Sequence, residues 1–341
     1  MSVFIIAEAG VNHNGDIALA RKLIDAAKNA CCDAVKFQSF KADRLVTKTA
    51  GKAQYQIENT NSAESQYEML KKLELSYNDH AELISYCREN NITFISTPFD
   101  EESADMLDNL GITVFKISSG DITDKHLLKH VAKKQKPVIL STGMSTLEEV
   151  EEALQWIYGE GNRNVTLLHC TSCYPAAVED VNLNAIKALQ HAFKVKVGYS
   201  DHTPGVEIPA AAVALGAEVI EKHITLDKSM PGPDHKVSLE PDELSKMVRY
   251  IRNIEKALGD GRKYPVQKEL DVREAARKYI VTNREIYKGQ VISYDMLCVK
   301  RAGKGIEPKQ MDSITGSVAL KDLAKGYALQ PGDFNKCRLT K

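Results

Sequence analysis

Short apolar runs alternate with helical stretches through the first two-thirds of the chain. The helical stretches include Ile17–Ala30 and Thr146–Tyr158, and the last, Pro241–Leu258, stops at Gly259. The apolar runs are Val3–Ala7, Ala34–Phe37, Thr93–Ser96, Val114–Ile117, Pro137–Leu140, Val165–Leu168, Val195–Tyr199 and Glu218–Glu221. Roughly eight β-runs over about 250 residues predict an α/β fold, a (β/α)8 barrel. A doubly wound open sheet could use the same elements, but the count favours closure, and no GxGxxG follows the first strand.

Polar side chains follow almost every predicted strand. In a barrel these positions gather at one mouth, where active sites lie. They include Glu8, Lys36, Gln38, Thr97, Lys116, Ser118, Ser119, Asp121, Ser141, His169, Tyr174, Ser200, His202 and His223. The repeated pattern predicts a polar pocket at the C-terminal ends of the strands.

Two histidines follow neighbouring strands. The runs ending at Tyr199 and Lys222 lead into His202 and His223, with an Ala-rich helix, Ile208–Leu215, between them. A βαβ unit makes the strands parallel and brings their C-terminal ends together. The pair, flanked by Asp201, Glu221 and Asp234, predicts a divalent-metal site. The alternative is that each histidine caps a strand end.

Two lysines and several hydroxyls indicate an anion pocket. Lys36 and Lys116 follow separate strands, and Ser119, Ser141 and Ser200 lie in or beside small turns. Ammonium groups, hydroxyls and turn N–H groups together favour a phosphate or a carboxylate. A Schiff-base lysine remains an alternative, although such chemistry does not need a metal.

Two carboxylates are candidates for acid–base or sugar contacts. Glu8 ends the first strand among apolar neighbours, which would shift its pKa toward a value that suits acid–base work. The alternative is that its carboxylate caps the Asn12–Gly15 turn. Asp234 lies in a stiff Pro-Gly-Pro loop that suits a sugar contact but is also an ordinary turn.

The chain divides into a barrel over residues 1–260, a charged linker over 261–278 and a small β-rich module over 279–341, with β-like pieces at Tyr279–Thr282 and Val291–Ser293. A module of about 60 residues is marginal alone and is expected to dock on something. After the second strand, Lys41–Ser76 is a long excursion, either a lid or substrate wall or an idle insertion.

Composition excludes several classes of protein. Lys plus Arg is 45 and Asp plus Glu is 46, a net charge of −1, so nothing global attracts nucleic acid or an anionic membrane. The N-terminus lacks a secretory leader, and no apolar run approaches about 18 residues. Seven scattered cysteines suit reduced thiols in a cytoplasm. The lone pair Cys170 and Cys173 lacks the second pair that a zinc ribbon needs.

Ordered motifs along nearly the whole chain resemble the sialic acid synthase family. They are IAEAGVNHNGD, VKFQSFKA, FISTPFD, KISSGD, ILSTGM, LLHCTSCYP, GYSDHTPG, EKHITLD and GPDHKVSLEPDEL, and VKRAGKG in the tail resembles the family's antifreeze-like SAF domain, a β-clip module. The resemblance implies a TIM barrel plus SAF domain in a domain-swapped homodimer.

The resemblance also implies a transferase that condenses phosphoenolpyruvate with an N-acetylmannosamine-type sugar and water, releasing phosphate by C–O cleavage. It implies Mn²⁺, with Mg²⁺ or another divalent cation as a substitute, held by His202 and His223, and Glu8 as the acid–base group. The implied phosphoenolpyruvate contacts are Lys36, Lys116, Ser119, Ser141 and Ser200. The implied sugar contacts are Gln38, Asp121, Tyr174, Asp234 and Arg301, the last reaching the partner subunit's site.

Two departures from the family pattern bear on the sugar. Asp121 stands where the family often has Glu, and Lys304 stands in a loop that often reads RPGNG. The first-choice product is N-acetylneuraminate. The alternative is N,N'-diacetyllegionaminate, made from 2,4-diacetamido-2,4,6-trideoxymannose. A pseudaminate synthase and a pyruvate-dependent barrel aldolase rank lower. A non-catalytic sugar-binding protein also ranks lower, because a pure binder need not keep both histidines, both lysines and Glu8.

Overall fold

The computed structural model describes residues 2–60 and 63–335. The chain forms two compact units, Met1–Gly259 and Asp260–Lys341. Each unit is described by itself.

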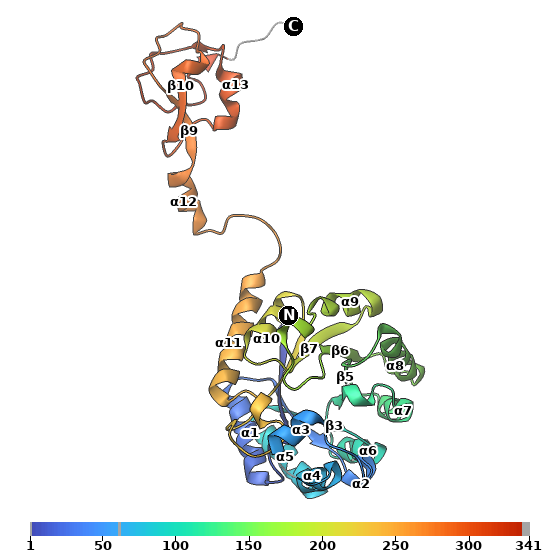
Figure 1. The fold of residues 1–341 in the computed structure, drawn as a ribbon. Coiled ribbons are helices and arrows are strands. Elements are labelled where there is room, and N and C mark those ends of the chain that lie inside the picture. The colour runs from blue at the N-terminus through green and yellow to red at the C-terminus, as the bar shows by residue number, and fades with distance from the viewer. Residues whose placement is uncertain (1, 61–62, 336–341) are drawn as a thin grey trace. The chain divides into compact units, whose positions relative to one another are not determined.

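The first unit is a closed barrel of eight parallel strands in chain order, as predicted (Figure 1). The strands are β1 (Phe4–Gly10), β2 (Ala34–Ser39), β3 (Thr93–Pro98), β4 (Phe115–Ile117), β5 (Val138–Ser141), β6 (Val165–Cys170), β7 (Lys196–Asp201) and β8 (Val219–His223). Several predicted runs were right in position but ended one or two residues early. Several residues expected just past a strand, such as His223, are therefore the last residues of the strand itself.

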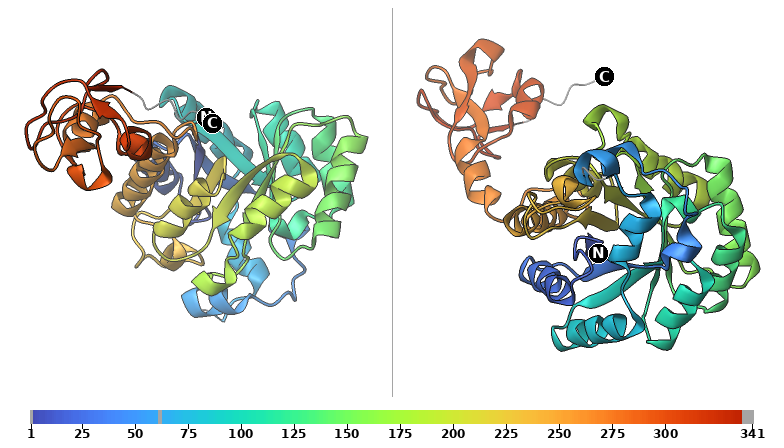
Figure 2. Two further views of the ribbon diagram at one scale, coloured as in Figure 1. Left: turned by 90° about the horizontal axis from the view of Figure 1, so that it is seen from above. Right: turned by 60° about the horizontal axis from the view of Figure 1, so that its bottom comes forward.

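Helices surround the strands, and Figure 2 shows them outside the barrel. The barrel helices are α1 (Ile17–Asn29), α5 (Tyr77–Glu89), α6 (Glu101–Asn109), α7 (Lys125–Lys133), α8 (Leu147–Gly159), α9 (Asn184–Phe193), α10 (Glu207–Ala214) and α11 (Pro241–Leu258). The excursion after β2 holds three short helices, α2 (Ala42–Leu45), α3 (Gln54–Thr60) and α4 (Gln66–Leu73).

Side-chain caps explain where several helices begin. The Asp16 carboxylate accepts from the N–H of Ala18 at the start of α1. Ser76 and Thr146 start α5 and α8 with reciprocal capping boxes to Asp79 and Glu149. Each cap satisfies backbone donors that the first helical turn would otherwise leave unpaired.

The inner face of the barrel changes from apolar to polar along each strand. A buried apolar cluster of Ile6, Ala34, Ile95, Ile139, Leu168 and Val219 fills the lower interior. Residues two positions further along a strand share its face. The same inner face therefore carries Glu8, Lys36, Thr97, Ser141, Cys170 and Glu221 one layer higher. The pleat of the strands thus builds a polar mouth above an apolar floor.

Gly198 lets β7 and β8 approach closely. A Cβ at this position would lie 2.3 Å from the backbone oxygen of Val219 and 2.7 Å from the Leu168 side chain. Because no side chain fits there, β7 packs directly against β8 and brings Ser200 and His202 beside Glu221 and His223.

The second unit is small and β-rich. Strand β9 (Lys278–Thr282) pairs antiparallel with β10 (Leu297–Arg301), and β11 (Val318–Ala319) pairs with β12 (Phe334–Asn335). Helix α13 (Met311–Ile314) completes it, around a core that includes Ile280, Ile292 and Leu329. The predicted strand at Val291–Ser293 was wrong, because Val291 makes only an isolated bridge to Val318.

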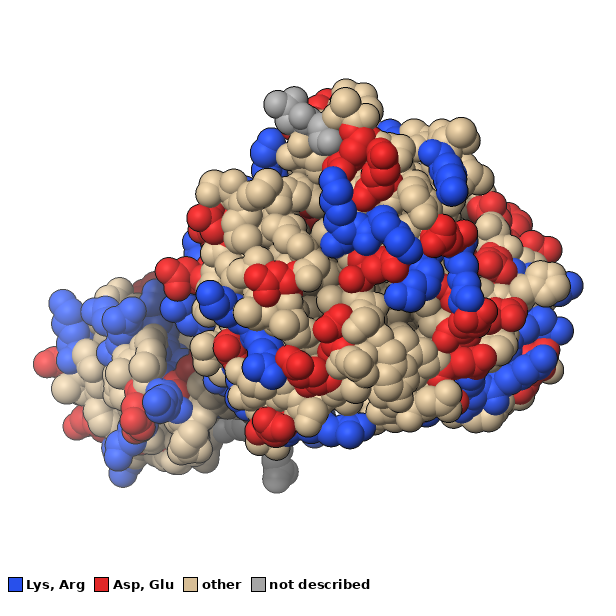
Figure 3. Space-filling model, turned by 90° about the horizontal axis from the view of Figure 1, so that it is seen from below, with Lys and Arg blue, Asp and Glu red and all other residues tan. Residues whose placement is uncertain are grey.

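The segment expected to be a linker contains one helix, α12 (Glu269–Ala276), and every residue from 256 to 278 is exposed. Charges of both signs mix on the face in Figure 3, in keeping with the net charge of −1. Within residues 2–60 and 63–335, no helix combines the length and apolar character needed to cross a bilayer.

Candidate functional site

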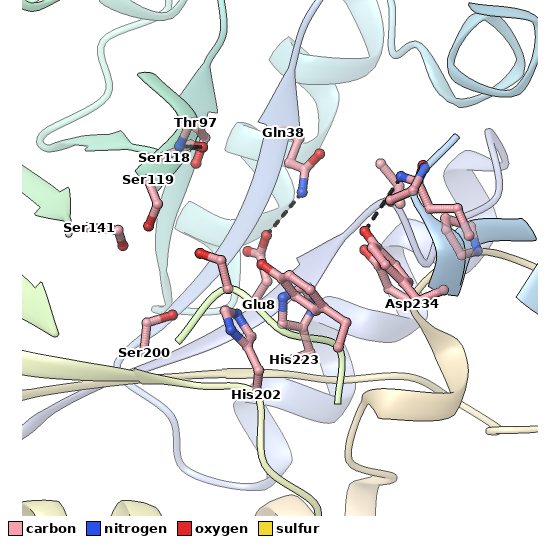
Figure 4. Close-up of a pocket in the computed structure, with 18 of the residues that line it drawn as sticks. Glu8, Gln38, Thr97, Ser118, Ser119, Ser141, Ser200, His202, His223 and Asp234 are labelled. Atoms are coloured by element: carbon pink, nitrogen blue, oxygen red, sulfur yellow. Dashed lines mark hydrogen bonds between the residues drawn. The ribbon is translucent and has the colours of Figure 1, made fainter. Parts of the chain in front are cut away.

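A cavity of about 780 Å³ opens at the C-terminal ends of the barrel strands. Eleven of the thirteen residues predicted as catalytic, metal or substrate contacts line it, and Figure 4 shows several of them pointing toward one another. They are Glu8, Lys36, Gln38, Lys116, Ser119, Ser141, Tyr174, Ser200, His202, His223 and Asp234.

Four buried charges lie at the base of the cavity. The Nζ atom of Lys36 lies 2.9 Å from Oε2 of Glu8 and 3.7 Å from Oε2 of Glu221. The Nζ atom of Lys116 lies 3.9 Å from Oε1 of Glu221. None of the four residues is more than 4% exposed. Two ammonium groups and two carboxylates thus share a nearly dry site, where charges interact far more strongly than in water.

The two carboxyls of this cluster titrate differently. Burial raises the pKa of Glu8 to about 7, although Lys36 pulls it down. Burial alone would also raise the pKa of Glu221, but Lys116 and Lys36 outweigh it and lower that pKa. Burial lowers the pKa of Lys116. Glu8 is therefore the group here that can exchange a proton near neutral pH.

Hydroxyl groups surround the lysines. Lys116 Nζ donates to Ser141 Oγ at 2.7 Å, and Lys36 Nζ lies 3.3 Å from Thr97 Oγ1. Ser200 Oγ donates to Glu221 at 2.9 Å. The Ser119 hydroxyl accepts from the N–H of Gly143 at 2.9 Å. Two cations ringed by small donors suit an anion with several oxygens.

The two histidines lie together as the βαβ argument predicted. Their ring centroids are 5.5 Å apart, and the Tyr174 ring packs 4.1 Å from that of His202. Burial is the main cause that lowers the pKa of both imidazoles, so both are neutral at pH 7. His202 Nδ1 donates to the carbonyl of Thr171 at 2.7 Å, which leaves its Nε2 lone pair free.

These two imidazoles fit a divalent cation. His223 Nδ1 is buried without a hydrogen-bond partner, and neutral imidazole nitrogens are common metal ligands. Among the described residues no group of three or more His, Cys, Asp or Glu side chains could hold a metal. The protein would therefore supply two ligands and leave the other positions to water and substrate.

One expected flanking carboxylate does not face the histidines. Asp201 alternates with Ser200 and His202 along the chain, so it points to the other face of the barrel wall and binds Lys222. Glu221 lies beside the two lysines, where it helps to hold them charged. The expectation that Asp201 flanks the two histidines was wrong, because strand periodicity turns its side chain to the other face.

The other wall of the cavity comes partly from the excursion after β2. Tyr55, Gln56 and Glu58 line the cavity, and Tyr55 stacks on Tyr174 with centroids 5.0 Å apart. Asn59 at the end of α3 donates to the carbonyl of Pro233 at 2.7 Å. The interpretation of Lys41–Ser76 as an idle insertion was therefore wrong.

Three predicted sugar-side residues, Gln38, Tyr174 and Asp234, lie in this part of the cavity. Gln38 Nε2 lies 3.4 Å from Glu8 Oε1. Asp234 Oδ1 is buried without a partner, and burial raises the pKa of Asp234 to about 6. An unpaired buried carboxylate is costly and would be satisfied by a hydroxyl of a bound sugar.

One predicted sugar contact of the first unit does not line the cavity, and another lies in the second unit. Asp121 ends a 3₁₀ turn, Ser119–Asp121, whose first two residues line the cavity while Asp121 itself does not. Burial raises the pKa of Asp121 to about 7. Arg301 is exposed at the end of β10 in the second unit.

Sequence reasoning missed two contributors. Glu221 was expected only as a carboxylate flanking the two histidines, yet its inward position two residues before His223 could have placed it in the lower layer with Lys36. Tyr55 carried only a weak signal, an aromatic residue in a polar excursion. Its stacking on Tyr174 depends on how the Lys41–Ser76 segment folds over the C-terminal end of the barrel.

Comparisons with known proteins show the family of the chain. The NeuB family matches residues 23–263, and the SAF domain matches residues 277–335. The N,N'-diacetyllegionaminic acid synthase of Campylobacter jejuni is 51% identical over 320 residues, which cover 93% of this chain and 96% of that protein. The Legionella pneumophila enzyme of the same name is 49% identical, covering 96% and 94%.

A solved structure is also similar. The N-acetylneuraminic acid synthetase from Leptospira borgpetersenii superposes with a TM-score of 0.71 and 37% identity, over 81% of this chain and 93% of that chain. The barrel followed by a SAF domain, expected from the resemblance, is confirmed.

Proposed function

The chain belongs to the NeuB family, and from this premise we propose that it is an N,N'-diacetyllegionaminate synthase. The coarser conclusion is that it is a transferase making a nonulosonic acid from phosphoenolpyruvate. The sugar is 2,4-diacetamido-2,4,6-trideoxymannose, which was the second choice from sequence.

Relative similarity favours this sugar over N-acetylmannosamine. Two diacetyllegionaminic acid synthases are 51% and 49% identical to the chain, whereas the N-acetylneuraminic acid synthetase is 37% identical. All three cover most of the chain, so the difference is not caused by partial matching.

The buried lysines support phosphoenolpyruvate as the second substrate. Its phosphate and carboxylate would pair with Lys36 and Lys116, while Ser119, Ser141 and Ser200 supply hydroxyls. In the free site Glu8 and Glu221 partly neutralise the lysines. A divalent cation on the two histidines would add to the positive charge that faces the phosphoenolpyruvate trianion, while Glu8 stays ionised as the base.

Carbon 3 of phosphoenolpyruvate attacks the aldehyde carbon of the open-chain sugar, and carbon 2 becomes cationic. Water adds at carbon 2, and its proton passes through the Glu8 carboxylate to the former aldehyde oxygen, which the attack left anionic. The C–O bond to phosphate then breaks to give the keto acid, and the second proton of the water leaves with the phosphate. A divalent cation on His202 and His223 would supply Lewis-acid activation of the aldehyde. Gln38, Tyr174 and Asp234 would orient the sugar.

The observation that carries the proposal is the convergence of a buried lysine pair and a neutral histidine pair on one cavity. The test is an incubation with phosphoenolpyruvate, Mn²⁺ and equal amounts of both candidate sugars, followed by mass spectrometry. Diacetyllegionaminate should be the dominant product. Dominant N-acetylneuraminate would overturn the choice of sugar, and no condensation product with either would overturn the reaction.

A further inference from the structure

A fully buried ion pair joins the two strands that carry the histidines. Lys222 on β8 binds Asp201 on β7, and both side chains are 0% exposed. The two residues are direct partners in the parallel register. Each is the immediate chain neighbour of a histidine, since Asp201 precedes His202 and Lys222 precedes His223.

The pair lies behind the wall of the cavity. Strand alternation turns Ser200, His202, Glu221 and His223 to the inside and Asp201 and Lys222 to the outside. Accordingly, neither member of the pair lines the cavity. It cannot touch a substrate in that cavity, so any effect on the site must pass through the backbone.

Hydrogen bonds of Asp201 and Lys222 hold the chain on both sides of His202. Asp201 Oδ1 accepts from Tyr199 Oη at 2.9 Å, from the N–H of Thr203 at 3.0 Å and from Thr203 Oγ1 at 2.8 Å. Lys222 Nζ also donates to the carbonyl of Thr203. Thr203 is 0% exposed, so this hydrogen-bonded cluster is closed to water.

Stability alone does not account for such a pair. Burying two charges costs several kcal/mol per ion, and well-packed apolar pairs are often as stable or more stable. What the pair fixes is geometry. The Nδ1 atom of His223 has no hydrogen-bond partner, so the position of this ring depends on its strand.

We propose that the Lys222–Asp201 pair is a positioning device that holds His202 and His223 at the spacing needed to bind one divalent cation. This inference rests on the proposed function, because it assumes the cation. Groups that orient metal ligands from behind typically change metal affinity about 10- to 100-fold when removed.

The test measures Mn²⁺ binding to the metal-free full-length protein by electron paramagnetic resonance of free Mn²⁺. The double variant Asp201→Asn/Lys222→Met removes both charges together and so leaves no uncompensated ion. We expect its Mn²⁺ affinity to fall about tenfold or more, with unchanged phosphoenolpyruvate affinity. Asp201→Asn alone, which keeps one acceptor oxygen, should also lower the Mn²⁺ affinity. It replaces the double variant in the test if that protein does not fold.

Ile220→Val is the matched control. Ile220 is fully buried on β8, two residues before Lys222, and its truncation should lower the melting temperature without changing Mn²⁺ affinity. Wild-type Mn²⁺ affinity in folded Asp201→Asn protein, or an equal loss in Ile220→Val, would overturn the proposal. An absence of Mn²⁺ binding in the wild type would overturn it as well, whereas the synthase reaction itself is judged separately by sugar-dependent phosphate release.

Discussion

Lys36 Nζ lies 2.9 Å from Glu8 Oε2 at the mouth of the barrel, and the two residues are only 4% and 1% exposed. They occupy equivalent heights on adjacent strands, because Glu8 and Lys36 are register partners of β1 and β2. The pair joins the anion-binding side of the cavity to its acid–base group.

Glu8→Gln should lower kcat about 100-fold or more, since acid–base groups typically contribute that much. With the Glu8 pKa raised to about 7, the ionised base forms as pH increases, so kcat/KM of the wild type should rise through about pH 7. The variant should lose that limb. Glu58→Gln, which alters an exposed carboxylate of the same cavity, is the control and should keep it.

Ser141→Ala should raise the KM for phosphoenolpyruvate about tenfold, because Lys116 loses a charge-assisted hydrogen bond of 2.7 Å. Ser145→Ala in the same loop is the control, since its hydroxyl bonds only the Gly143 carbonyl and does not line this cavity. Steady-state kinetics at saturating sugar measure both. Equal effects of the two variants would argue against the assigned anion pocket.

Asp234→Asn should stabilise the ligand-free protein while weakening sugar binding. Burial raises the pKa of Asp234 from 3.8 to about 6, so the folded chain binds this proton more tightly than the unfolded chain. The ionised form is therefore destabilising by ~3 kcal/mol above about pH 6, and the penalty vanishes below about pH 4. Urea unfolding should show a gain for the variant at pH 7.5 and none at pH 3.5.

Asp227→Asn is the comparison for that measurement. Hydrogen bonds from Ser229 lower the pKa of Asp227, which sits in the same loop, so its replacement should give no gain at pH 7.5. A gain as large as that of Asp234→Asn would show that the effect does not come from burial.

His202→Ala should abolish metal retention and phosphate release and leave the fold intact. Chelation of the wild type should stop phosphate release, and Mn²⁺ should restore it. His169→Ala is the control, because His169 faces away from the cavity and bonds the Val181 carbonyl. Full activity of metal-free His202→Ala protein would remove the metal assignment.

Arg301→Ala should mainly raise the KM for the sugar. From the resemblance we propose that Arg301 reaches the partner subunit's site, and mixing subunits tests this. A mixture of Glu8→Gln and Arg301→Ala subunits should regain activity at low sugar, because one site of each mixed dimer then has both groups intact. No recovery after verified subunit exchange would place Arg301 outside the partner's site.

The barrel could be predicted because an apolar run followed by a helical stretch recurs about eight times. The polar residues at the ends of the runs indicated the same fold. The convergence of His202 with His223 followed from one βαβ unit. The pairing of Asp201 with Lys222 was not foreseen, since a carboxylate beside a histidine resembles a metal ligand until the strand face is known. The stacking of Tyr55 on Tyr174 depends on the fold of an irregular excursion, which no period encodes.

The most direct test of the central claim follows the bridging oxygen of phosphoenolpyruvate. With this oxygen labelled as ¹⁸O, the sugar and Mn²⁺ present, mass spectrometry should find the label in the released phosphate, and release should require the sugar. Label retained in the sugar product, or condensation with pyruvate and no phosphoenolpyruvate, would contradict the account.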